Sequence, residues 1–175
     1  MADEYIIPLR IKGLAQLFHS LDPSPFLERD FDAEALQYII DWAQDAPRDA
    51  GFAIVVDLSA EAPEPPAEHL LADAVRGNFS YRADRATREL RELFRTGQRA
   101  LLIGLPILAA SLAASRAIGA GAGPLTQLLG ESLLILGWVA NWRPLEIFLY
   151  DWAPIVRRRA LYRRLAGARV ELRRV

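Results

Sequence analysis

Two long apolar runs stand out in the pattern of hydrophobic and polar positions along the chain. The first covers residues 100–115 and holds no charged side chain, whereas the second covers 125–142 and holds one, Glu131. A helix needs roughly 20 mostly apolar residues to cross a hydrocarbon core of about 30 Å. The runs are 16 and 18 residues long and can extend into the glycine-rich turn at about 116–124. Because the first run lacks a polar face, the pattern predicts a two-helix transmembrane hairpin over 100–142.

Alternating apolar positions predict strands on both sides of this hairpin. Residues 5–11 and 52–58 alternate in the manner of half-buried strands. Pro8 lacks a backbone N–H, so the first of these strands is expected at a sheet edge or with a bulge. Residues 168–175 alternate more weakly and predict a possible final strand. This last strand pairs either within its own chain or with a neighbouring copy.

Helical patterns lie between the first two strands. Residues 13–21 favour a short helix, and residues 33–45 favour a second helix with Asp32 as its N-cap. A strand, helices and a strand form a small α/β unit, with a right-handed crossover between parallel strands. The sequence therefore predicts a small cytoplasmic α/β domain over 1–60.

The remaining segments complete an α+β membrane protein. Residues 61–67 are rich in Pro and Glu and predict a linker, and residues 68–99 predict a long basic helix that continues into the first apolar run. After the hairpin, residues 143–175 predict an amphipathic segment in the membrane interface and a basic cytoplasmic tail.

Arginines on both flanks of the hairpin predict its orientation. Residues 1–70 carry four basic and fourteen acidic side chains, although the net charge of the whole chain is only −1. Basic residues are concentrated beside the apolar runs, and the turn between the runs holds only Arg116. Short flanks rich in Arg stay in the cytoplasm. We therefore expect a multi-pass protein of the bacterial inner membrane with both termini cytoplasmic.

Glu131 is the most unusual residue of the second run. A carboxylate inside a membrane segment is costly and by default marks a functional site. Glu131 is either protonated, paired with Arg116, or exposed to an ion pathway along an oligomer axis. The alternative is that water or lipid headgroups reach it near the outer interface, and this alternative is favoured.

Aromatic and basic residues near the end of the hairpin predict contacts with the lipid bilayer. Aromatic side chains gather at membrane–water boundaries, and the candidate interface anchors are Trp138, Trp142, Tyr150 and Trp152. Basic clusters beside a membrane attract anionic lipid, and the candidate lipid contacts are Arg143, Arg157, Arg158, Arg159, Arg163 and Arg164. Anionic lipid is a closer partner for this cluster than nucleic acid.

The sequence carries no enzyme signature. Cysteine is absent, which excludes disulfides and thiolate chemistry, and His19 and His69 are the only histidines. Neither histidine stands in a recognisable triad, and the acidic residues match no metal-binding loop. No catalytic, metal or cofactor site is therefore predicted.

The block at residues 137–152, GWVANWRPLEIFLYDW, is followed by Pro154 and a run of arginines. It resembles a family of small uncharacterised bacterial inner-membrane proteins with a cytoplasmic α/β region and two membrane helices. The resemblance covers roughly half of the chain, from the Arg-rich helix to the tail. It implies the same architecture and carries no activity.

Three functions follow from these observations, in order of preference. The first is a non-enzymatic, self-associating membrane scaffold or adaptor. It forms a homo-oligomer and can also bind an unknown protein partner. The second is an oligomeric pore or ion-coupled assembly that uses Glu131. The third is a membrane-bound enzyme of unknown type.

Overall fold

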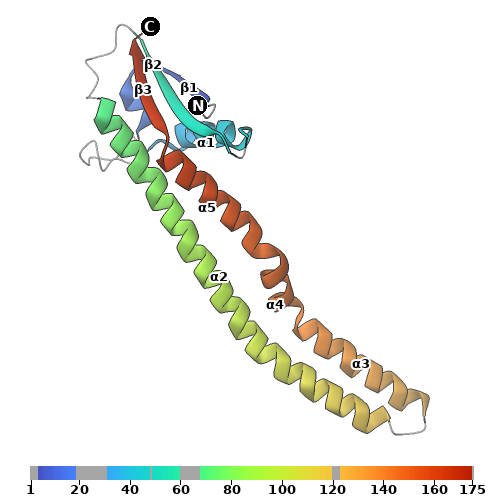
Figure 1. Ribbon diagram of the computed structural model, residues 1–175. Helices are drawn as coiled ribbons and strands as arrows, with labels where there is room; N and C mark the ends of the chain where they lie inside the picture. Colours follow the sequence, from blue (N-terminus) through green and yellow to red (C-terminus); the bar gives the residue numbers. More distant parts are fainter. Residues whose placement is uncertain (1–3, 19–30, 48, 60–67, 120–122, 175) are drawn as a thin grey trace. The chain divides into compact units, whose positions relative to one another are not determined.

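The computed structural model describes residues 4–18, 31–47, 49–59, 68–119 and 123–174 (Figure 1). Its contacts divide the chain into two compact units, which are described separately below. The sheet unit consists of Met1–Arg85 with Arg157–Val175, and the hairpin unit consists of Ala86–Val156. The start of the long helix and the end of the chain therefore belong to one unit with the N-terminal α/β segment, which the predicted boundary at residue 60 had separated from them.

The described part of the sheet unit contains a small parallel sheet of three strands. They are β1 (Glu4–Ile11), β2 (Gly51–Leu58) and β3 (Arg169–Arg174), and they lie in the order β1-β2-β3 (Figure 1). Both pairings are parallel, with Ile7 opposite Ile54 and Ile54 opposite Val170. The expected final strand is present as β3, and it pairs with β2 of its own chain. Pro8 lies in an edge strand, as its missing N–H predicts.

Helices cover one face of this sheet. Helix α1 (Ala33–Gln44), the start of α2 (Glu68–Gly119) and the end of α5 (Trp152–Ala166) contribute to a single hydrophobic core with the strands. Its most deeply buried side chains are Ile7, Leu17, Ile39, Ile54, Leu58, Leu71, Phe79 and Leu165. Successive parallel strands joined by right-handed crossovers receive their helices on the same face. Sequential strand order therefore explains why the helices gather on one side.

The opposite face of the sheet carries short apolar and charged side chains. Ile6 on this face is 55 % exposed, whereas Ala53 and Val55 on the central strand are buried. Arg10 of β1 forms a salt bridge with Asp57 of β2, and Arg169 of β3 forms salt bridges with Glu171 of its own strand and with Glu4 of β1.

Local signals in the sheet unit behave as predicted at α1 and differ at residues 13–21. The Asp32 side chain accepts hydrogen bonds from the backbone N–H groups of Glu34 at 2.9 Å and Ala35 at 3.3 Å, which confirms the N-cap. The helix expected over 13–21 is wrong in length: the described segment holds only the 3-10 helix η1 (Leu14–Leu17). Phe18 instead forms an antiparallel bridge with Phe31, and the two rings pack 5.0 Å apart. The predicted linker at 61–67 lies outside the described residues.

The hairpin unit is built from helical segments. Helix α2 is continuous to Gly119 and contains Pro106. The chain returns through α3 (Pro124–Ala140), α4 (Trp142–Glu146) and a short π-helix, η2 (Ile147–Asp151), before α5 begins. The interruption of the returning helix at residues 141–151 coincides with the aromatic and arginine block of the sequence.

Candidate functional site

Exposed apolar side chains cover the hairpin unit. By length and composition, α2 is the one helix in the described residues that is long and apolar enough to cross a membrane, and 11 % of its apolar window is buried. Helix α3 is 17 residues long and mostly apolar, and it buries only Gly130 and Gly137. On α2 and α3, the large aliphatic side chains that are at least 49 % exposed are Leu102, Ile103, Leu105, Leu125, Leu128, Leu129, Ile135, Leu136 and Val139. An exposed apolar surface of this size marks a membrane or protein interaction site.

Small residues bring α2 and α3 into close contact. Gly97, Gly104 and Ser111 are buried at seven-residue spacing on α2, and Gly130 and Gly137 are buried at the same spacing on α3. Seven residues are close to two helical turns, so each set lies on one face of its helix. Small residues at such positions let membrane helices approach closely. We call this contact line the glycine seam.

Gly137 is the tightest point of the glycine seam on α3. A Cβ atom at this position would lie 2.9 Å from Leu108 Cδ1, 3.1 Å from Ser111 Cβ and 3.2 Å from Leu108 Cα. At Gly130 the nearest atoms to such a Cβ are the Oγ of Ser115 at 3.4 Å and its backbone oxygen at 3.5 Å, so this position has more room. The seven-residue spacing of these two glycines is visible in the sequence. The closer approach of α2 at Gly137 depends on how the two helices pack.

Asn141 ends α3 and fastens it to α2. Its backbone N–H bonds to Trp138 O at 3.0 Å. Its side-chain Nδ2 donates to Gly137 O at 3.0 Å and to Gly104 O on the facing helix at 2.9 Å. The residue is 5 % exposed, and its Oδ1 accepts no hydrogen bond from the described residues. A buried amide that satisfies one carbonyl on each helix fixes the register of the hairpin, and sequence analysis did not identify this residue.

Arg143 organises the turn after Asn141. Its guanidinium lies 3.2 Å from a carboxylate oxygen of Glu146 and 3.1 Å from one of Asp151. The other oxygen of Glu146 accepts a hydrogen bond of 2.8 Å from Trp142 Nε1. These side chains tie α4 to the end of the π-helix. Arg143, a predicted lipid contact, is therefore paired with two carboxylates.

The π-helix η2 packs against α2 at Gly97, the first residue of the glycine seam. Ile147 is fully buried and reaches the space that a Cβ on Gly97 would occupy, at 2.9 Å. The ring of Phe148 stacks on Phe94 at 5.9 Å. Short π-helical segments are frequent at functional sites, and this one changes which side chains of the returning helix face α2.

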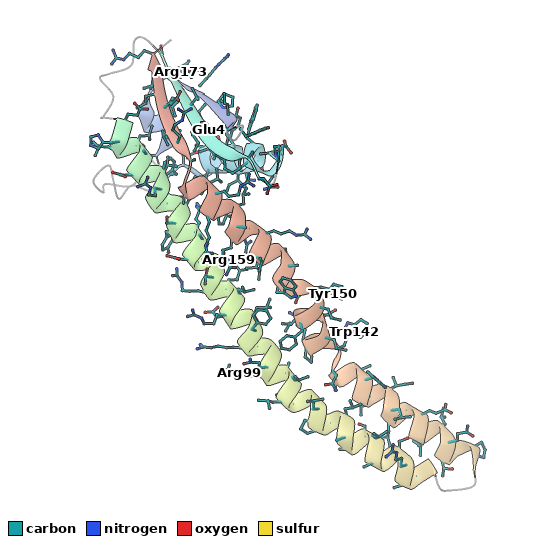
Figure 2. All side chains as sticks on the ribbon, viewed as in Figure 1. Glu4, Arg99, Trp142, Tyr150, Arg159 and Arg173 are labelled. Atoms are coloured by element: carbon teal, nitrogen blue, oxygen red, sulfur yellow. The ribbon has the colours of Figure 1, made fainter. Side chains whose placement is uncertain are left out.

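The predicted interface anchors are exposed around this turn. Trp138, Trp142 and Tyr150 are 63 %, 64 % and 69 % exposed, and Trp152 is 37 % exposed. The indole N–H of Trp152 donates to Phe148 O at 3.0 Å. Figure 2 shows Trp142 and Tyr150 on the returning segment and Arg99 on α2. The four aromatic residues are spread over positions 138–152 of the returning segment, and their role as an interface belt stays a prediction.

Glu131 and Arg116 do not pair in the described part of the chain. Both side chains are exposed, and Glu131 accepts a hydrogen bond of 3.4 Å from Gln127 Nε2, one turn away on the same helix. Glu131 follows the buried Gly130 directly, so it lies outside the glycine seam.

The arginines after the hairpin separate into two groups. Arg164 is occupied by the sheet unit: its Nη2 donates to Pro47 O at 2.8 Å and Ala50 O at 2.6 Å, and its guanidinium lies 4.5 Å over the Phe52 ring. Arg158 also has an interaction partner. Exposed or half-buried side chains without an ion pair in the described chain are Arg157, Arg159 and Arg163. Of the predicted lipid contacts, Arg143 and Arg164 therefore already have structural contacts within the chain.

The described residues contain no group of three or more His, Asp or Glu side chains that could hold a metal ion. His69 is exposed at the start of α2, and His19 lies outside the described residues. The features that stand out are therefore the apolar surface, the glycine seam and the arginine and aromatic residues beside them.

Comparisons with family models, with curated proteins and with solved structures found no match to this chain. The family resemblance of residues 137–152 stays a prediction.

Proposed function

We propose that this protein is a membrane-anchored, self-associating scaffold or adaptor without enzymatic activity. In this proposal the hairpin over 100–142 spans the bacterial inner membrane, and the sheet unit lies in the cytoplasm. The observation that carries the proposal is the apolar surface of the hairpin unit, whose large side chains are exposed on both α2 and α3. A bilayer core can cover this surface, while the side chains between α2 and α3 keep their contacts within the hairpin.

The spacing of charges along α2 supports a membrane span. Arg99 and Arg116 are 17 residues apart in this helix. At about 1.5 Å per residue, this distance is about 25 Å. A bilayer core is about 30 Å thick, and arginine side chains at both ends can extend toward the headgroups. Helix α3, with 17 residues, is of similar length.

The connectivity of the sheet supports cytoplasmic termini. β2 and β3 are neighbouring parallel strands, and the whole hairpin belongs to the connection between them. The start of α2 and the end of α5 pack into the same core. A connection that leaves one sheet and returns to it crosses a membrane an even number of times. The arginines on both flanks favour the cytoplasmic side.

The sheet unit offers surfaces for self-association. In the described residues, β1 and β3 are both edge strands, and helices cover only one face of the sheet. Edge strands are templates for pairing between chains, and parallel sheets are normally covered on both faces. A second copy of the chain or a protein partner can cover these surfaces, and such binding is what a scaffold requires.

The topology can be tested with cysteine labelling, because the chain has no natural cysteine. We expect a Gly123→Cys variant to react with a membrane-impermeant maleimide in intact spheroplasts. A Gln44→Cys variant, on the exposed face of α1, should react only after lysis. Labelling of Gln44→Cys in intact spheroplasts, or protection of Gly123→Cys, would contradict the proposed orientation.

The scaffold role is tested by the particle mass in nanodiscs. We expect a mass of at least two copies for the full chain. A single copy per nanodisc at all protein concentrations would remove self-association from the proposal and leave a monomeric anchor.

The alternative function, a pore or ion-coupled assembly, rests on the exposure of Glu131 outside the glycine seam. The carboxylate lies seven residues from Pro124, about 10 Å from the start of α3. If it serves an ion pathway, Glu131→Gln should abolish a conductance of reconstituted protein and preserve assembly. Absence of ion flux in the wild-type protein under voltage and pH gradients would exclude this alternative. An enzymatic role has no supporting feature among the described residues.

A further inference from the structure

Three arginines form a stripe on the outer face of α2, beside the apolar surface. Arg91, Arg95 and Arg99 are four residues apart, and all three are exposed. At about 100° per residue, Arg95 and Arg99 lie about 160° from Gly97 around the helix, and Arg91 lies about 120° from it. Gly97 faces Ile147 and Phe148. The three side chains therefore point away from the returning helix, and we call them the arginine stripe.

The arginine stripe has no partner in the described part of the chain. None of its guanidinium groups lies within ion-pair distance of a described carboxylate. Arg143 and Arg164 differ from the stripe in this respect, because carboxylates and backbone carbonyls occupy them. The stripe is thus a set of exposed cations whose hydrogen-bonding groups are available to a ligand.

Contacts within the hairpin unit place the stripe at one end of the apolar surface. Asn141 packs against Gly104, and Ile147 packs against Gly97. The intervening Arg99 is therefore level with the segment that carries the exposed Trp142 (Figure 2). Beyond Arg99, Arg95 lies one turn, or about 6 Å, farther from the apolar run. A headgroup layer is several ångströms thick on each side of the core, which matches the position of these two residues.

We propose that the arginine stripe binds the phosphate groups of anionic phospholipids in the cytoplasmic leaflet. This inference rests on the proposed membrane insertion of the hairpin. Guanidinium groups form two parallel hydrogen bonds with phosphate, and they do so more specifically than ammonium groups. The apolar side chains that begin directly after Arg99 contact the acyl chains of the same lipids. The stripe therefore combines headgroup and acyl-chain recognition, and Arg91 adds longer-range attraction to the anionic surface.

The lipid is favoured over another protein as the ligand because the stripe continues directly into the exposed apolar surface. A second copy of the chain offers a competing anionic surface, since α1 exposes Glu34 and Asp41, and its C-cap residue Asp45 is also exposed. α1 also exposes Tyr38 and Trp42, but these are two single aromatic side chains and not a continuous apolar run like residues 100–107. The two ligands give different results in the experiment below.

The experiment compares lipid selectivity between two triple variants of the full chain. The test variant carries Arg91→Gln, Arg95→Gln and Arg99→Gln. The control variant removes three exposed arginines of the sheet unit, Arg10, Arg76 and Arg85, by substitution with Gln, so both variants lose the same charge. Each protein is placed in mixed micelles with phosphatidylglycerol and phosphatidylcholine. Native mass spectrometry then measures the ratio of the two bound lipids.

We expect the test variant to lose at least tenfold of the preference for phosphatidylglycerol, because each basic residue near an anionic surface contributes about fivefold in affinity. The control variant should keep the wild-type preference. An Arg-to-Lys triple variant at the stripe should keep part of the preference, which separates ligand binding from loss of the fold.

Other results overturn the proposal. An unchanged lipid ratio in the test variant, or an equal loss in the control, excludes the stripe as a lipid site. A lower oligomer mass with an unchanged lipid ratio assigns the stripe to a second copy. If the wild-type chain is soluble and binds neither lipid, membrane insertion itself is wrong, whereas insertion without stripe-dependent selectivity refutes only this inference.

Discussion

The glycine seam makes a prediction that two matched substitutions can test. Gly137→Ala and Gly130→Ala place the same methyl group on the same helix, on the same contact line and two turns apart. At Gly137 the new Cβ would lie 3.2 Å from Leu108 Cα and 2.9 Å from Leu108 Cδ1. At Gly130 the nearest atom would be Ser115 Oγ at 3.4 Å, which is ordinary contact.

The magnitude follows from two opposing effects. Replacing Gly by Ala inside a helix stabilises it by up to about 1 kcal/mol in either position. Overpacking a closely packed contact costs about 1–3 kcal/mol, and this cost applies to Gly137, where a backbone atom of the facing helix must move. Gly130→Ala should therefore be neutral or slightly stabilising, whereas Gly137→Ala should be less stable than Gly130→Ala by about 1–3 kcal/mol.

Reversible unfolding in mixed micelles measures this difference. Tryptophan fluorescence is a suitable signal because Trp138 is adjacent to Gly137, and far-UV circular dichroism gives an independent one. Equal stabilities of the two variants would refute the close approach of the helices at Leu108. Greater loss at Gly130 would indicate a different register of the hairpin.

Three further predictions concern the sheet unit. Arg164→Lys should lower its stability by about 1–3 kcal/mol, because an ammonium group cannot both bond the two loop carbonyls and stack on a ring; thermal unfolding measures this loss, and an unchanged midpoint would contradict the clamp. Asp32→Ala should cost about 1 kcal/mol through loss of the N-cap, whereas Asp41→Ala on the exposed face of the same helix should change stability little by the same assay. Deletion of 168–175 removes β3 and leaves two strands, which are too few for a stable sheet; we expect loss of assembly or rapid proteolysis of the domain, and a deletion variant with wild-type mass and protease resistance would show that β3 is dispensable.

Sequence patterns were sufficient where the signal is local. Asp32 caps α1 because an acidic side chain next to an amphipathic run can reach the first free N–H groups of the helix. The alternation in residues 5–11 and 52–58 depends only on the two faces of a strand, and both strands are present. The composition of the apolar run after Arg99 was enough to predict a helix, and α2 continues through this run without a break. At residues 13–21 the local pattern was insufficient, because Phe18 pairs with Phe31, a residue outside the predicted helix, instead of continuing η1.

The tertiary structure decided the features that depend on residues far apart in the sequence. Asn141 and Gly104 are separated by 37 positions, and only the packing of α3 on α2 brings the amide to that carbonyl. Arg164 and Ala50 are separated by 114 positions, so a residue in an arginine cluster became a clamp on a loop of the sheet unit. The sequence likewise allowed β3 to pair within its own chain or with a neighbouring copy, and the structure pairs it with β2 of its own chain. Periodicity and composition describe the faces of each element, whereas the pairing of two faces is set by the shape of both, and that information is not present in either segment alone.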